Sequence, residues 1–230
     1  MKEARILVVD DEPQIIRFLR PALDAAGYDM LEAGTGADAL RKAATLAPDV
    51  MILDLGLPDM DGKDVISRVR SFSDLPILIL SARDRESEKI EALDLGADDY
   101  IEKPFRIGEL LARVRTALRH HGKADRPVAR ISTQGLVIDF EHRTVERHGK
   151  SIKLTPKEYD LLAILARNAG KVLTHRTLLT AVWGPAHVED TQYLRVFIGQ
   201  LRSKVEDIAE KPVHISTEPG VGYRFNDSES

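Results

Sequence analysis

Five polar side chains in the first half of the chain are of types that can bind a metal ion and a phosphoryl group. Carboxylates that crowd together repel one another, and the usual remedy in proteins is a hard cation such as Mg²⁺, which prefers oxygen ligands. An ammonium and a hydroxyl can hold the other oxygens of a phosphoryl group carried on a carboxylate. The residues are Asp10, Asp11, Asp54, Ser81 and Lys103.

Each of these side chains stands at or just after the end of a strand-like run. Continuous apolar runs at 6–9, 50–53 and 77–80 are typical of strands buried on both faces of a parallel sheet, and weaker strand patterns occur at 28–32 and 99–101. Helical patterns lie between them, which predicts a doubly wound α/β domain with a parallel five-stranded sheet. Right-handed crossovers place all the strand-to-helix turns at one edge of such a sheet, so the five side chains are predicted to meet in one crevice.

The acidic residues also have other interpretations. An isolated aspartate at a strand end is more often a helix cap, and the convergence of several groups is what favours a phosphoryl site for Asp11 and Asp54. Asp10 could be only a helix-entry carboxylate. The stretch 59–62 resembles the start of a calcium loop, but the twelfth position falls on Arg70 rather than on a glutamate, so we interpret the stretch as a turn.

Motifs of the first half occur at residues 8–12, 53–62, 80–82, 96–100 and 103–105. In this order and spacing they resemble the response-regulator receiver family, which has a CheY-like (flavodoxin-like) fold. The resemblance covers the whole first half and implies that a sensor histidine kinase phosphorylates Asp54. It also implies that Asp11, Asp54 and the Gly56 carbonyl ligate Mg²⁺ directly, while Asp10 acts mainly through water.

The same resemblance assigns roles to residues at the later strand ends. It implies that Ser81 and Lys103 bind the phosphoryl oxygens, with the Lys103-Pro104 peptide in the cis form, and that Tyr100 is a rotameric switch. A phosphoryl group adds a charge of about −1.5 to −2, so we expect Ser81 to move toward it and to vacate space for the Tyr100 ring. Plain packing of Tyr100 beside the strand remains the alternative.

The second half shows strands first, then helices, then a hairpin. Alternating patterns predict strands at 136–140, 144–147 and 151–154. Thr155 and Glu158 have the spacing of a helix capping box. A second helix follows Thr174, a third is predicted over 191–205, and residues 214–217 and 223–225 flank a glycine-containing hairpin turn. We predict an α+β winged helix-turn-helix domain.

The third helix carries a polar stripe opposite its apolar face. Gln192, Arg195, Gly199 and Arg202 recur at spacings of three or four residues. Arginine reads guanine edges or clamps phosphates, glutamine can pair with adenine, and a glycine would let the helix approach a groove wall closely. Taken alone, the stripe is typical of an amphipathic surface helix. The hairpin with Arg224 that follows favours a DNA-reading helix with a wing.

Motifs of the second half occur at residues 154–159, 176–184, 201–206 and 217–225. They resemble the OmpR/PhoB-type winged-helix effector over residues 131–225. The resemblance implies binding to double-stranded promoter DNA and a contact between the loop 184–190 and RNA polymerase. The predicted DNA-binding residues are Gln192, Arg195, Gly199, Arg202, Lys204 and Arg224.

Four charged residues of the first half occupy positions that form a two-fold dimer face in regulators of this subclass. They are Lys89, Asp99, Glu109 and Arg113. Exposed ion pairs stabilise by only about 0–1 kcal/mol each, but they can select one geometry among weak dimers. We expect phosphorylation to favour a homodimer through this face, with a solvated charged surface as the alternative. Within the subclass, the stretches 56–59 and 193–202 further resemble regulators of potassium-transport operons.

The 230 residues suit two domains. We expect a receiver domain at 1–121, a polar linker at 122–130 and an effector domain at 131–227. Residues 1–120 hold 17 Lys and Arg against 23 Asp and Glu, while the remainder holds 16 against 14. The second half is thus the more basic one, by a margin small enough to arise by chance.

The composition also bears on location. Cysteine is absent, which excludes disulfides and thiolate metal sites. No apolar run approaches the length of a membrane span, and the first residues lead straight into a strand-like run. We therefore expect a cytoplasmic protein without a signal peptide and without a membrane partner.

Two other functions fit parts of the sequence. A metal-dependent phosphohydrolase could use Asp54 as its nucleophile, but no insertion at the crevice is long enough to form a lid. We therefore expect a regulator rather than an enzyme. A receiver with an RNA- or protein-binding output is the third possibility, and the polar stripe with its wing favours DNA.

Overall fold

The computed structural model describes residues 4–82, 86–121 and 129–226. The chain divides into two compact units, Met1–Ala124 and Asp125–Ser230. The predicted linker at 122–130 lies outside the described residues except for its last two positions.

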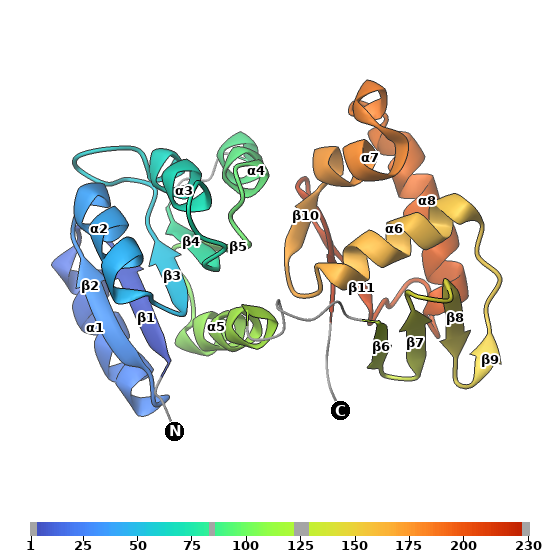
Figure 1. Cartoon of the computed structure of the whole chain (residues 1–230), viewed down its shortest axis with the longest axis horizontal. Coiled ribbons are helices and arrows are strands. Elements are labelled where there is room, and N and C mark those ends of the chain that lie inside the picture. Colours follow the sequence, from blue (N-terminus) through green and yellow to red (C-terminus); the bar gives the residue numbers. More distant parts are fainter. Residues whose placement is uncertain (1–3, 83–85, 122–128, 227–230) are drawn as a thin grey trace. The chain divides into compact units, whose positions relative to one another are not determined.

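A parallel five-stranded sheet in the order β2-β1-β3-β4-β5 forms the centre of the first unit (Figure 1). All of its neighbouring strands pair in parallel. Each strand begins and ends within one residue of its predicted bounds, so the doubly wound prediction is confirmed. The strands are β1 (Arg5–Val9), β2 (Asp29–Ala33), β3 (Val50–Leu53), β4 (Ile77–Ser81) and β5 (Asp99–Glu102).

Helices alternate with these strands along the chain. Pro13 stands at the first position of the first helix, where its missing N–H leaves no hydrogen bond unmade. Thr35 and Asp61 cap the next two helices through their side chains. The helices are α1 (Pro13–Ala25), α2 (Gly36–Leu46), α3 (Gly62–Arg70), α4 (Glu86–Asp94) and α5 (Ile107–His121).

Apolar side chains of the sheet alternate between its two faces. Ile6 and Val8 of β1 pack with Leu19 of α1 and Leu110 of α5 on one face. The intervening Leu7 of β1 points to the other face, where α2 contacts β1 and β2. Because both faces are covered, the central strands β1, β3 and β4 are almost entirely apolar, and polar side chains gather at the strand ends.

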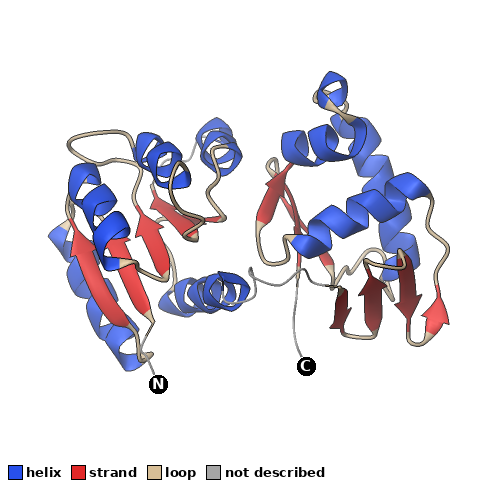
Figure 2. Ribbon diagram, in the orientation of Figure 1, coloured by secondary structure: helices blue, strands red, loops and turns tan. Residues whose placement is uncertain are grey.

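Two small antiparallel sheets flank the helices of the second unit (Figure 2). One has the order β6-β7-β8-β9 and the other β10-β12-β11. The first consists of β6 (Arg130–Thr133), β7 (Leu136–Asp139), β8 (Thr144–Arg147) and β9 (Lys150–Ser151). The second consists of β10 (Val172–Thr174), β11 (Ile215–Glu218) and β12 (Gly222–Phe225).

The helices of the second unit begin where the caps predict. The Thr155 hydroxyl accepts from the Glu158 amide and the Glu158 carboxylate accepts from the Thr155 amide, which confirms the capping box. The elements are α6 (Pro156–Arg167), α7 (His175–Trp183), the 3₁₀ turn η1 (Pro185–His187) and α8 (Thr191–Val205). No helix within the described residues is both long and apolar enough to cross a membrane.

Several strands of the second unit differ from the sequence prediction. The strand predicted at 151–154 is wrong beyond Ser151. The Ile152 amide still donates to the Val145 carbonyl of β8, but the alternating side chains of Ile152 and Leu154 pack against the core of the unit. Strands β6 and β10 were not predicted. Gly222 explains how β10 can pair with β12, since a Cβ there would lie 1.9 Å from the Leu173 carbonyl oxygen.

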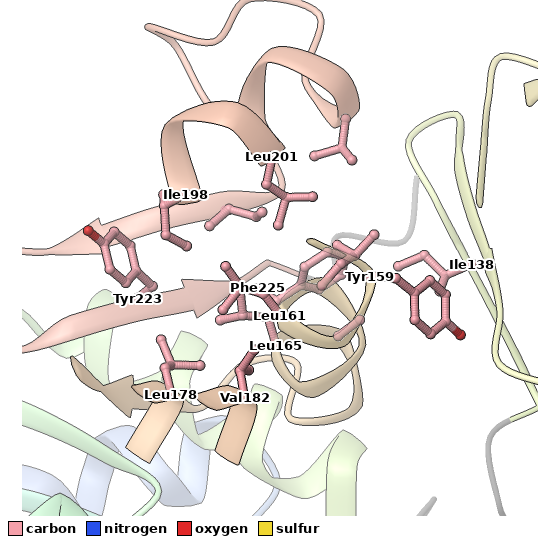
Figure 3. Packing of buried hydrophobic residues seen from close by; sticks show 14 of the residues in the cluster. Ile138, Tyr159, Leu161, Leu165, Leu178, Val182, Ile198, Leu201, Tyr223 and Phe225 are labelled. Carbon is pink, nitrogen blue, oxygen red and sulfur yellow. The ribbon is translucent and has the colours of Figure 1, made fainter. Parts of the chain in front are cut away.

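One apolar core joins the helices and both sheets of the second unit (Figure 3). Phe225 of β12 is fully buried at its centre, and burying such a side chain contributes about 1.5–3 kcal/mol. Ile198 and Leu201 of α8 enter the same core. The apolar face of α8 is thereby fixed inward, and its opposite face is left for solvent or a partner.

Candidate functional site

Charged side chains from three strand ends meet at the carboxyl edge of the parallel sheet. The Lys103 ammonium, just after β5, lies 2.8 Å from Asp10 Oδ2 and 3.0 Å from Asp54 Oδ1. Asp10 follows β1 and Asp54 follows β3. Glu12, which the sequence analysis did not single out, also reaches Lys103 at 3.3 Å. Its position next to two aspartates in the 10–12 run was the signal for it.

Burial makes this cluster electrostatically costly. Asp10 is 3% exposed and Asp54 is 8% exposed. Burial, together with the charge of Asp54, raises the pKa of Asp10, while hydrogen bonds from Lys103 and from the Glu12 amide offset part of the rise. Burial would lower the pKa of Lys103, but its hydrogen bonds to Asp10 and Asp54 outweigh that effect and raise it. The ammonium therefore stays protonated and balances the buried carboxylates.

Backbone groups orient the two aspartates. Asp10 Oδ1 accepts a hydrogen bond from the Glu12 amide at 2.8 Å, and Asp54 Oδ2 accepts one from the Gly56 amide. A Cβ at Gly56 would stand only 3.1 Å from that same Asp54 oxygen. The Lys103-Pro104 peptide is cis, as predicted.

The other predicted members of the site lie less centrally. Asp11 is exposed, and no group of three or more His, Cys, Asp or Glu side chains within the described residues gathers as a metal site. Asp11 directly follows Asp10 in the chain and lies just before α1, with its side chain open to solvent. Ser81 is buried at the end of β4, and Tyr100 lies half-buried in β5 with the Lys89 ammonium 5.2 Å from its ring centroid.

The donor chemistry of the cluster suits magnesium. Mg²⁺ is commonly held by one or two carboxylates together with several waters and a phosphate. Asp10 and Asp54 supply two carboxylates that converge on Lys103, and burial, the main cause of the raised pKa of Asp10, disfavours a charge there that a nearby cation would stabilise. The residues present therefore fit such an ion.

The predicted dimer residues form ion pairs within their own unit. Arg113 pairs with Asp99 at 2.7 Å and with Glu109 at 3.1 Å. Lys89 pairs with Glu102. These pairs link α4 and α5 to β5, so the four charges already have partners inside one copy of the chain.

The predicted DNA-binding residues fall into two groups. Gln192, Arg195 and Gly199 are exposed on α8, and a Cβ at Gly199 would meet no atom within 4 Å. Exposed Val196 lies between them on the same helix. This face of α8 is free of intramolecular packing around Gly199 and can approach a partner surface.

The second group is held by the protein itself. Arg202 donates to the Ile215 carbonyl at 2.6 Å and to the Thr217 hydroxyl, which fastens α8 to β11. Lys204 lies 2.6 Å from Glu158, a carboxylate that is only 3% exposed. These contacts connect the recognition-helix candidate to the hairpin and to α6.

Arg224 on β12 belongs to this second group. It is buried, lies 2.8 Å from Glu218 and donates to the Gly170 carbonyl at 2.6 Å. Sequence spacing placed Arg202, Lys204 and Arg224 on the right elements. It could not show their partners, because those partners lie on distant segments.

Family profiles match both units. The profile described as "Response regulator receiver domain" matches residues 6–115, and the one described as "Transcriptional regulatory protein, C terminal" matches residues 149–225. The KDP operon transcriptional regulatory protein KdpE of Escherichia coli K12 is 50% identical over 220 residues, covering 96% of this chain and 98% of that protein. KdpE of Mycobacterium tuberculosis H37Rv is 49% identical over 223 residues, with the same coverage.

Among solved structures, the response regulator DrrB of Thermotoga maritima, described as an OmpR/PhoB homolog, matches with a TM-score of 0.52 and 31% identity. The match covers 98% of this chain and 100% of that one. The sequence motifs, the family profiles and the full-length relatives all indicate the same family. The chain belongs to the OmpR/PhoB-type two-component response regulators, DNA-binding transcription regulators rather than typical enzymes, whose family partners are a histidine kinase and DNA.

Proposed function

We propose that this chain accepts a phosphoryl group on Asp54 from a sensor histidine kinase and that the modification controls its binding to promoter DNA. The observation that carries the proposal is the convergence of Asp54 and Asp10 on Lys103 at the edge of the sheet. A carboxylate whose neighbours are a lysine and a second carboxylate has the surroundings that phosphoryl acceptance requires.

The transfer needs no proton on Asp54. An ionised Asp54 oxygen attacks phosphorus, the bond from phosphorus to the donor imidazole nitrogen breaks, and that nitrogen keeps the electron pair. Lys103 then binds phosphoryl oxygen in place of carboxylate, with Ser81 donating a further hydrogen bond. Asp10, Asp11, Asp54 and the Gly56 carbonyl would hold Mg²⁺, which when bound neutralises charge on the phosphoryl oxygens.

In this proposal the phosphoryl signal passes to the β5 edge of the sheet. Ser81 and Tyr100 act as the switch, and the face formed by Lys89, Asp99, Glu109 and Arg113 supports a homodimer of the phosphorylated form. The intramolecular pairs of Arg113 with Asp99 and Glu109 would re-form between copies.

The DNA-binding half uses α8 as its recognition helix. We place the receiver domain at 1–121, the linker at 122–130 and the effector domain at 131–227. Gln192, Arg195 and Gly199 face the major groove of double-stranded DNA, while Arg202, Lys204 and Arg224 also hold the helix and hairpin in place. The loop 184–190 contacts RNA polymerase. A potassium-transport operon is the proposed target, supported by 50% identity to KdpE, and action on DNA implies a cytoplasmic location.

Intact-mass spectrometry tests the proposal. The full chain is incubated with Mg²⁺ and acetyl phosphate, and we expect the mass of one phosphoryl group to be added to the wild type and to Asp64→Ala, a control that removes a carboxylate from α3. Asp54→Ala should gain no mass while keeping the fold measured by circular dichroism. Equal phosphorylation of Asp54→Ala would refute the assignment.

A further inference from the structure

The loop between β3 and α3 is hydrogen-bonded to the N-terminus of α2, the helix that follows β2. The Asp59 carboxylate accepts from the Gly36 amide at 2.8 Å through Oδ1 and from the Ala37 amide at 3.0 Å through Oδ2. These are amides of the first turn of α2, which has no intrahelical partners for them. The hydroxyl of the local cap, Thr35, accepts from a different amide, that of Asp38. A distant carboxylate therefore completes the cap of α2.

Packing supports the same contact. Gly36 is buried, and a Cβ at this position would lie 2.5 Å from Met60 Cγ and 2.7 Å from Met60 Sδ. The Met60 side chain thus lies directly over the α2 N-terminus, next to the residue that binds it. The hydrogen bonds to Ala37 and Gly36 lower the pKa of Asp59, which keeps the carboxylate ionised.

The loop that Asp59 holds against α2 begins at Asp54, the proposed phosphoacceptor. Gly56 donates its amide to Asp54 Oδ2 and pairs with Asp61 in an isolated antiparallel bridge. The Gly62 amide donates to the Leu55 carbonyl at 3.0 Å. The loop is therefore closed at its base, and Asp59 fixes its tip.

The helix that Asp59 caps is connected through β2 to the backbone of Asp10. The α2 helix follows β2, whose last residue, Ala33, accepts a hydrogen bond from the Asp10 amide at 3.1 Å. Asp59 thus connects the loop that carries Asp54 and Gly56 to the turn that borders Asp10.

We propose that Asp59 is a positioning residue of the phosphoacceptor site, which fixes the Gly56 carbonyl and the Asp54 carboxylate relative to Asp10. The inference rests on the proposed function. Asp59 touches none of the reacting atoms, so its loss leaves the chemical groups in place and lets the loop move. The consequence is weaker binding of Mg²⁺, because the oxygen ligands are no longer held at one separation. Residues that orient ligands in this way change metal affinity by about 10- to 100-fold.

Three variants of the full chain test the proposal: Asp59→Ala, Asp59→Asn and the control Asp64→Ala. Mg²⁺ binding is measured by isothermal titration calorimetry without a phosphodonor, and exchange of the Gly36 and Ala37 amides is measured by NMR without metal. We expect Asp59→Ala to weaken Mg²⁺ binding about tenfold, the lower end of that range. The same variant should increase the hydrogen-exchange rates of both amides. Asp59→Asn, which keeps one acceptor oxygen, should recover part of the affinity, and Asp64→Ala should match the wild type.

Phosphorylation by acetyl phosphate is then followed against Mg²⁺ concentration. For Asp59→Ala we expect a higher half-saturating Mg²⁺ concentration and an unchanged maximal rate of phosphorylation. General destabilisation of the fold would not produce this combination. An unchanged Mg²⁺ affinity in a folded Asp59→Ala protein overturns the inference while leaving the proposed function intact. A wild type that binds Mg²⁺ but takes up no phosphoryl group refutes the proposed function instead.

Discussion

At the scale of single residues, the proposed phosphoacceptor site holds more negative than positive charge. Lys103 faces Asp10, Asp54 and Glu12, so one ammonium meets three carboxylates. The sequence predicted the convergence, since apolar strands leave only their ends for polar groups. It could not predict that Asp11 stays exposed while Glu12 reaches the lysine, because that choice depends on side-chain direction at the entry to α1.

Replacing Asp10 should therefore stabilise the fold. Its pKa is raised, chiefly by burial, so between the ordinary value of 3.8 and the raised value the folded protein binds more protons than the unfolded chain. The free energy of unfolding then falls as the pH rises through that window, and ionised Asp10 lowers stability at neutral pH. We expect Asp10→Asn to raise the calorimetric unfolding midpoint of the receiver transition and to weaken Mg²⁺ binding, with Asp11→Asn as an exposed control. A lowered midpoint would mean that pairing with Lys103 outweighs burial.

A buried histidine gives the second unit a pH dependence. His214 is fully buried, with Nε2 2.6 Å from an Arg147 nitrogen. Its pKa is lowered mainly by burial and further by Arg147, against the opposing charges of Glu206 and Asp207. Below the ordinary value of 6.5, the unfolded chain therefore takes up a proton before the folded one does. The free energy of unfolding should fall as the pH drops from 6.5 toward the lowered pKa.

Trp183 reports on this unit, because it is the single tryptophan of the chain and packs against α8. Urea unfolding followed by its fluorescence, repeated at several pH values, should show the loss of stability in the wild type and in the exposed-site control His142→Gln. His214→Gln should flatten the dependence. If the free energy of unfolding of His214→Gln kept the pH dependence of the wild type, groups other than His214 would be its cause.

At the scale of elements, the prediction from sequence succeeded where the hydrophobic period was long and regular. The five strands of the parallel sheet and α8 were located to within one residue. Strand β10 was missed because three residues, 172–174, carry too short a pattern, and its pairing depends on the close approach that Gly222 permits. The strand expected at 151–154 was overextended because Ile152 and Leu154 pack against the core of the unit beyond the end of β9.

The recognition-helix assignment makes opposite predictions for stability and for binding at Gly199. A methyl group there meets open space within the protein, and alanine is more favourable than glycine inside a helix by about 1 kcal/mol. We expect Gly199→Ala to raise the free energy of unfolding, measured by Trp183 fluorescence, and to weaken binding to promoter DNA, because the methyl group projects toward the groove. Ser203→Ala, on an exposed position further along α8, is a matched control for stability. If Gly199→Ala bound DNA as tightly as the wild type, close approach at this position would be excluded.

At the scale of the whole molecule, the chain consists of two compact units, and the proposed regulation acts between them. Each unit has its own core, and the motifs that identify each one lie within it. Local sequence patterns were therefore sufficient to predict both folds. They were insufficient for the contacts of Arg202, Lys204 and Arg224, whose partners lie on other elements of the same unit. The proposed function requires that phosphorylation of the first unit changes DNA binding by the second.

A titration of promoter DNA, recovered by genome-wide mapping of sites bound by this protein, tests that communication most directly. The full chain is titrated with Mg²⁺ present, with and without acetyl phosphate, in parallel with Asp54→Ala. The account predicts that acetyl phosphate tightens binding of the wild type, by a factor within the range of about 5- to 150-fold that is typical of coupling between sites, and leaves Asp54→Ala unchanged. Equal affinities of the wild type under both conditions, or an equal response of Asp54→Ala, would contradict it.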